Sequence, residues 1–127
     1  MKNNTEIIRM QQMVAEFVTE REWNQFHTLK NLSMNIAVEA AELMEPFLWC
    51  STETSGDLMK EKREEIEDEF ADVLIGLLCF ANAAKIDTFK AFERKLEKTK
   101  AKYPVDVVRG RSDKYTYYRE LKKKDQR

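Results

Sequence analysis

The sequence predicts an all-α fold, a four-helix bundle protomer that assembles into a homo-oligomer. Its 127 residues include only three Gly and two Pro, and no segment shows the apolar–polar alternation that is typical of a strand. Apolar residues recur instead at helical spacing in four segments, which short polar connections separate. Because short connections favour antiparallel neighbours, a helical bundle is the expected architecture.

The first two helices are expected near residues 5–21 and 31–48. Thr5 is a suitable N-cap for the first helix, since its hydroxyl can accept a hydrogen bond from a free backbone N–H group. An aromatic link at residues 23–27 follows. Pro46 lies close to the end of the second helix, where the missing backbone donor should kink or loosen the last turn.

A third helix is expected over about residues 58–84, after a loop at 51–57, and a fourth over about 89–102. The third begins with charged residues and continues almost wholly apolar. A helix that is apolar all round is buried, so a second copy of the chain, in a dimer or tetramer, should cover what one protomer leaves exposed. The chain divides into a helical domain, residues 1–104, and a polar basic tail, residues 105–127.

Composition and charge exclude several classes of protein. The net charge of −1 gives no general attraction to nucleic acid or to an anionic membrane. No apolar run approaches the roughly 18 residues that a membrane span needs, and the N-terminal residues have no apolar signal core. Cys50 and Cys79 form no metal or disulfide framework. These features favour a reduced cytoplasmic location.

Two pairs of acidic residues lie in or beside the most apolar segments: Glu39 with Glu42, and Glu69 with Asp72. At about 100° per residue, each pair falls on one strip of its helix. Antiparallel packing of the second and third helices would bring the strips together. Since like charges at low dielectric repel strongly, a divalent cation, Mg²⁺ or alternatively Mn²⁺, is expected to hold them.

The spacing alone is weak support for a metal site. Glu61 and Glu64 repeat it on a segment that is charged on all sides, which is typical of a solvated face. The Glu39–Glu42 and Glu69–Asp72 pairs differ from it because they lie in or beside apolar segments, and this placement is what favours a metal site. A di-iron bundle would need Glu-x-x-His on two helices, and the single histidine, His27, lies outside both strips.

Several segments in order resemble the all-α nucleoside triphosphate pyrophosphohydrolases, the MazG-like group, and within it the dCTP pyrophosphatase branch. The resemblance covers about residues 15–116. It rests on FVTEREWNQFH at 17–27, EAAELMEPFLW at 39–49 and EFADVLI at 69–75, and it continues through Lys95, Lys102-Tyr103-Pro104 and Lys114-Tyr115. Each motif is weak alone, and their order is what makes the match specific.

The resemblance implies hydrolysis of dCTP, or of a related or modified deoxynucleoside triphosphate, to the monophosphate and pyrophosphate, in nucleotide-pool house-cleaning. It implies metal ligation by Glu39, Glu42, Glu69 and Asp72, with Glu39 or Glu42 activating the attacking water. Aromatic side chains would stack on the base and lysines would meet the phosphates. The substrate-binding residues expected on this basis are Trp23, His27, Asn31, Trp49, Lys95, Lys102, Lys114 and Tyr115.

Three positions depart from the family pattern and leave the substrate open. Val38 stands where many relatives have another Glu, Thr99 where an Asn is expected, and Gly76 where a bulkier residue is common. A dUTP-hydrolysing or broad-range enzyme is therefore an alternative. From another class, a non-catalytic helical interaction module would use the same acids as a partner-facing surface.

Overall fold

The computed structural model describes residues 5–126, and this part of the chain is helical and contains no strand. Met1–Asn4, where a signal segment would begin, and Arg127, at the end of the basic tail, lie outside the described residues. The predicted all-α class is confirmed. The α-helices are α1 (Thr5–Glu20), α2 (Leu29–Met44), α3 (Ser55–Glu61), α4 (Arg63–Ala84), α5 (Thr88–Lys102), α6 (Val105–Val108) and α7 (Tyr115–Asp125), with 3₁₀ helices η2 (Trp23–Phe26) and η3 (Glu45–Phe47).

The chain forms two compact units, which divide between Ile86 and Asp87. The first unit holds α1 to α4 and the second holds α5 to α7. This grouping puts α5 with the C-terminal segment, whereas the sequence-based division at residue 104 kept it with the preceding helices. That division stays a prediction.

The ends of α2 follow from its flanking residues. Thr28 caps its start, because the threonine hydroxyl accepts a hydrogen bond of 3.2 Å from the backbone N–H of Asn31. The α-helix ends at Met44 and continues as the 3₁₀ turn η3, which contains Pro46. Since proline cannot donate the next helical hydrogen bond, the loosened last turn expected from the sequence is present.

The third predicted helix is wrong in its limits, because the structure divides it into α3 and α4 at Lys62. Lys62 has φ −119° and ψ 34°, outside the α-helical region. The predicted loop at 51–57 is also too long, since α3 begins at Ser55. At its other end α4 stops at Lys85, which adopts a left-handed conformation with φ 56°.

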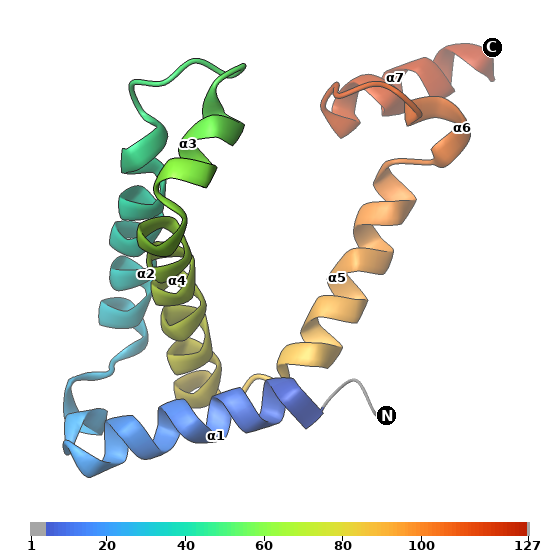
Figure 1. The fold of residues 1–127 in the computed structure, drawn as a ribbon. Helices are drawn as coiled ribbons and strands as arrows, with labels where there is room; N and C mark the ends of the chain where they lie inside the picture. The colour runs from blue at the N-terminus through green and yellow to red at the C-terminus, as the bar shows by residue number, and fades with distance from the viewer. Residues whose placement is uncertain (1–4, 127) are drawn as a thin grey trace. The chain divides into compact units, whose positions relative to one another are not determined.

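In the first unit α2 and α4 run side by side and α1 crosses them (Figure 1). Val18 of α1, Leu32 of α2 and Cys79 of α4 form the buried core, so each helix contributes one residue to it. Gly76 allows the close approach of α2, since a Cβ atom there would lie 3.3 Å from Cγ1 of Ile36.

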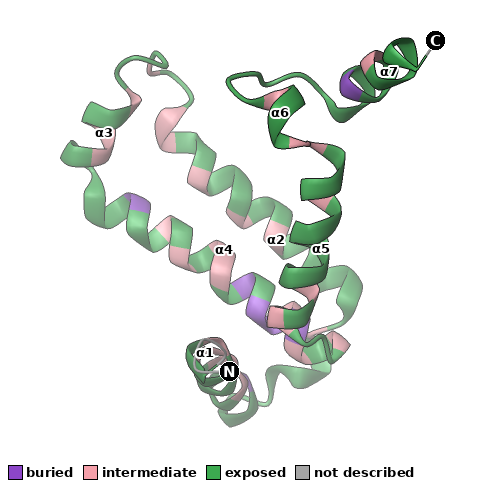
Figure 2. Cartoon of the chain, turned by 90° about the vertical axis from the view of Figure 1, so that its right-hand side faces the viewer, coloured by how far each residue is buried: buried purple, intermediate pink, exposed green. Residues whose placement is uncertain are grey.

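Much of the apolar surface of α4 remains uncovered in one protomer. Only five of its residues are buried (Figure 2): Ile66, Gly76, Leu78, Cys79 and Ala81. Phe70 is 61% exposed and Leu77 is 48% exposed. None of the described helices combines the length and apolar character that crossing a membrane would require.

The second unit is organised around Tyr118 of α7, which is 3% exposed. Its hydroxyl accepts a hydrogen bond of 3.0 Å from the backbone N–H of Asp113. Its ring meets Tyr103 and Tyr117 edge to face, with centroids 5.9 Å and 5.8 Å apart. The segment that the sequence analysis described only as a polar basic tail therefore contains a packed helix.

Candidate metal centre

The structure brings together carboxylates from α2 and α4. Oxygen atoms of Glu39, Glu69 and Asp72 all lie within 4.8 Å of one another. Glu69 and Asp72 share one face because they are three residues apart on α4, and Glu39 faces them because α2 packs along α4. Glu39 and Glu69 are half-buried and Asp72 is exposed. Three of the four predicted metal ligands thus form one cluster.

Two oxygen atoms in this cluster, Oε2 of Glu39 and Oε2 of Glu69, are buried and have no hydrogen-bond partner within residues 5–126. Loss of hydration raises the pKa of both carboxyl groups above the ordinary value of 4.5. Repulsion from Glu42 and Asp72 raises the pKa of each further. Glu42, the fourth predicted ligand, is therefore close enough to both residues to act on them electrostatically.

A divalent cation suits this arrangement. Hard cations prefer carboxylate oxygen, and Mg²⁺ usually takes a few carboxylates together with water and substrate phosphate. A buried acceptor without a donor costs free energy, and a cation between Glu39 and Glu69 would supply the missing partner for both orphaned oxygens. The donors present therefore fit Mg²⁺ or Mn²⁺, and they lack the nitrogen and sulfur ligands typical of zinc sites.

A hollow of about 410 Å³ opens beside the carboxylates and has an aromatic residue at its edge. Trp49, which the sequence analysis expected to meet the base, is 92% exposed there. Lys62 adds a positive charge on the same hollow. The residues that line it are Glu42, Glu45, Pro46, Trp49, Lys62, Glu65 and Glu69.

The other predicted base-binding residues lie beyond the opposite end of α2. His27 lines a second hollow, also of about 410 Å³, together with Asn24, Cys79 and Asn82. A helix of 16 residues is about 24 Å long, so His27 and Trp49 are too far apart in one chain to enclose a single base. Trp23 packs edge to face on Phe17, with ring centroids 5.6 Å apart, and is 42% exposed.

Asn31 has a structural role at the start of α2. Its side-chain Nδ2 donates a hydrogen bond of 3.2 Å to the carbonyl oxygen of Phe26, and its backbone N–H donates to the Thr28 cap. The predicted contact between Asn31 and substrate stays a prediction. The side-chain amide of Asn31 already connects α2 to the aromatic segment at residues 23–27 through its hydrogen bond to Phe26.

All four residues expected to contact the phosphates belong to the second unit. Lys102 and Tyr115 come together, because the Lys102 Nζ atom lies 4.7 Å from the centroid of the Tyr115 ring. Lys114 directly precedes Tyr115 and is the N-cap residue of α7. Lys95 is exposed on α5, about two turns before Lys102.

Sequence reasoning missed one polar pair at the second hollow. Asn82 of α4 donates a hydrogen bond of 3.0 Å to the carbonyl oxygen of Gln11, and its Oδ1 accepts one of 3.1 Å from Gln11 Nε2. An asparagine in the apolar run at residues 73–84 was a visible signal, because buried polar groups need partners. The position of Lys62 on the hollow beside the carboxylates could not be predicted in this way, because the residues around it in the sequence are also charged.

Comparison with known proteins identifies the family. Residues 34–117 match the model of the MazG-like family. The chain is 36% identical to dCTP pyrophosphatase 1 of Bos taurus over 80% of its own length, and equally similar to that of Homo sapiens. It spans about 62% and 61% of the length of these relatives.

A solved structure agrees with this assignment. A pyrophosphatase from Archaeoglobus fulgidus DSM 4304 superimposes with a TM-score of 0.75 at 38% identity, over 78% of this chain and 93% of the archaeal one. The family match includes α4 and most of α2, which carry the carboxylate cluster. The chain therefore belongs to the MazG-like family.

Proposed function

We propose that the protein is a metal-dependent nucleoside triphosphate pyrophosphohydrolase that acts on dCTP or a related or modified deoxynucleotide. The observation that carries this proposal is the carboxylate cluster, in which two buried oxygens have no hydrogen-bond partner among the described residues. The relatives named dCTP pyrophosphatase support the choice of substrate. A house-cleaning role in the cytoplasm belongs to the same proposal.

The chemistry needs charge neutralisation and an oriented water more than a covalent intermediate. Bound Mg²⁺ would neutralise the phosphates and acidify water. The water oxygen forms a bond to phosphorus, the bridging bond between the α- and β-phosphates breaks, and a carboxylate takes the proton of the water. A positioned base must accept that proton, and Glu39 or Glu42, both carried by α2 beside the proposed cation site, is the proposed candidate.

Substrate contacts follow the sequence-based prediction. Trp49, which is the most exposed of the large apolar residues and borders the same hollow as Glu42 and Glu69, is proposed to stack on the substrate. Aromatic stacking contributes on the order of 1–3 kcal/mol per base. Trp23, His27 and Asn31 at the other end of α2, and Lys95, Lys102, Lys114 and Tyr115 in the second unit, complete the proposed set.

Self-association is part of the proposal. A hollow of about 580 Å³ on α2, α3 and α4 is lined by apolar side chains, among them Met44, Phe47 and Phe70. Arg63 and Glu67 line the same hollow and form an ion pair of 2.7 Å with each other. Since monomers rarely expose contiguous apolar patches of this kind, a second copy is proposed to cover it. Sedimentation of wild type and Phe70→Glu would test the dimer or tetramer.

Substitution of two carboxylates tests the activity. Glu42→Gln and Asp72→Asn should each abolish release of pyrophosphate from dCTP in Mg²⁺, while circular dichroism shows the helices intact. Glu16→Gln, which changes an exposed acid on α1, is the matched control and should keep full activity. Turnover that persists in both test variants would refute the proposal.

A substrate panel separates the alternatives. Pyrophosphate release from dCTP, modified cytosine nucleotides, dUTP and ribonucleotides distinguishes the dCTP enzyme from a dUTP or broad-range one. A non-catalytic interaction module would release none and would show no thermal shift with Mg²⁺ plus a non-hydrolysable triphosphate. The enzyme should be stabilised under these conditions, because ligands that bind only the folded state raise the melting temperature.

A further inference from the structure

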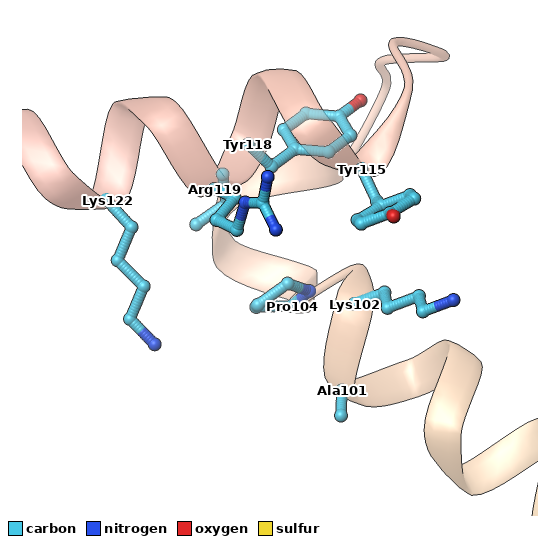
Figure 3. A pocket seen from close by; sticks show the side chains of 8 residues that line it. Ala101, Lys102, Pro104, Tyr115, Tyr118, Arg119 and Lys122 are labelled. Carbon is cyan, nitrogen blue, oxygen red and sulfur yellow. The ribbon is translucent and has the colours of Figure 1, made fainter.

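The second unit contains a hollow of about 280 Å³ that shares no lining residue with the carboxylate cluster or with the three hollows described above. Its floor is apolar and comes from the end of α5, from α6 and from α7 (Figure 3). Tyr118, which is 3% exposed, is fixed there by its hydrogen bond from Asp113. The lining residues are Ala101, Lys102, Pro104, Val107, Tyr115, Tyr118, Arg119 and Lys122.

Three cations border this apolar floor, and no carboxylate lines it. Arg119 and Lys122 lie one turn apart on α7, and within residues 5–126 no ion pair is formed by either. Lys102 is held on the other side against the ring of Tyr115. Figure 3 shows the Arg119 guanidinium between Lys122 and Tyr115. Neighbouring cations, in contrast, are paired: Lys123 with Glu120 and Arg111 with Asp113.

We propose that this hollow binds a small organic anion, an aromatic or aliphatic group that carries one phosphate or carboxylate. The anionic head would lie between Arg119 and Lys122, and the body would pack on Tyr118, Val107 and Pro104. Guanidinium groups bind phosphate and carboxylate with two parallel hydrogen bonds. The apolar floor selects against a bare inorganic ion, and the unopposed charges select against a neutral ligand.

The size of the hollow limits the ligand. Pockets for drug-sized molecules occupy roughly 300–1,000 Å³, so about 280 Å³ suits one ring with its charged group better than a whole nucleoside triphosphate. Lys102 and Tyr115 line this hollow and also belong to the proposed substrate contacts. The anion contacts are placed on Arg119 and Lys122, which belong neither to the carboxylate cluster nor to those substrate contacts, so variants at these two positions test the hollow separately from the pyrophosphohydrolase activity.

Titration with phenyl phosphate tests the site. Backbone amide shifts of ¹⁵N-labelled protein are followed in EDTA, so that no divalent cation is available to the carboxylates. We expect saturable shifts concentrated in residues 101–107 and 115–122, with an affinity at least tenfold above that for inorganic phosphate or benzyl alcohol. Benzoate, which has the same ring on a carboxylate, shows which head is preferred. Equal affinity for inorganic phosphate, or shifts elsewhere only, would overturn the proposal.

Three variants and one control assign the contacts. Arg119→Gln and Lys122→Gln should each lower the affinity for phenyl phosphate by about tenfold, since a hydrogen bond to a charged group is lost. Ala101→Leu should fill the hollow without removing charge, and it should lower the affinity for phenyl phosphate as much as the two charge-removing variants do. Lys123→Gln makes the same charge change outside the hollow and should bind as wild type does. Loss of affinity in Lys123→Gln equal to that in Arg119→Gln would reduce the effect to general charge attraction and refute the site.

Discussion

Replacement of Glu39 by Gln should stabilise the metal-free protein and greatly reduce its stabilisation by Mg²⁺. Glu39 faces Asp72 and Glu69 with oxygen atoms within 4.8 Å of one another. At that distance two unit charges repel by about 0.9 kcal/mol in a water-like medium and by about 3.5 kcal/mol at an effective dielectric constant near 20. The neutral amide removes the repulsion and can donate a hydrogen bond to a remaining carboxylate.

The expected gain at pH 7 in EDTA is therefore about 1–3 kcal/mol in the free energy of unfolding, which is the range that the Glu39–Asp72 distance allows. For a chain of this size it corresponds to a rise of roughly 4–12 °C in melting temperature. Mg²⁺ should stabilise wild type, by about 2.7 kcal/mol at a hundredfold excess over its dissociation constant. The variant should gain much less, because one ligand is missing.

Differential scanning calorimetry of both proteins, in EDTA and over a series of Mg²⁺ concentrations, measures the gain in metal-free stability and the stabilisation by Mg²⁺. Glu16→Gln controls for the loss of a charge on an exposed helix surface and should follow wild type in both buffers. The reasoning fails if Glu39→Gln is less stable than wild type in EDTA, because repulsion would then not dominate the cluster. It also fails if Mg²⁺ stabilises the variant as much as wild type.

Three further predictions concern the same unit. Because the pKa values of Glu39 and Glu69 are raised, the folded protein keeps protons that the unfolded chain has already lost. The free energy of unfolding of the metal-free protein should therefore fall as pH rises from about 4.5 through the raised pKa values. Urea titrations in EDTA at several pH values test this, and a free energy of unfolding that does not change with pH contradicts it. Gly76→Ala should change stability by less than about 1 kcal/mol, because helix propensity offsets the close contact with Ile36, whereas Gly76→Leu should cost about 1–3 kcal/mol. Trp49→Ala should leave the melting temperature unchanged and raise the KM for dCTP by roughly tenfold or more; unaltered KM would remove Trp49 from the site.

The fold class and the meeting of Glu39 with Glu69 and Asp72 were predictable, because helical periodicity places each set of acids on one strip and the apolar faces indicate that the two helices pack together. Glu69 and Asp72 share a face at any point of a helix, and the apolar residues around them indicated which face packs. The break at Lys62 was not predictable, since the surrounding charged residues are all compatible with a continuous helix. The packed helix α7 was missed because its many lysines suggested a solvated tail, although Tyr118 among them has the character of a core residue.

The base-binding prediction shows a different limit of sequence reasoning. Trp23, His27 and Trp49 lie near α2 in the sequence, but α2 is long enough to separate His27 from Trp49 by about 24 Å. Proximity in sequence implies proximity in space only within a turn or two of helix. Arg119 and Lys122 illustrate the converse, since their hollow depends on how α7 packs on the end of α5, and no local pattern encodes that packing.

Core packing and the proposed metal site share the same two helices, α2 and α4. Gly76 lies one turn after Asp72, and Ile36, against which it packs, lies one turn before Glu39. A larger side chain at position 76 would push α2 from α4 beside the carboxylates and would lengthen the distances between their oxygens. Because Mg²⁺ demands near-ideal geometry, Gly76→Leu should lower metal affinity although Gly76 is no ligand. Gly76 is thus a candidate determinant of the geometry of the carboxylate cluster.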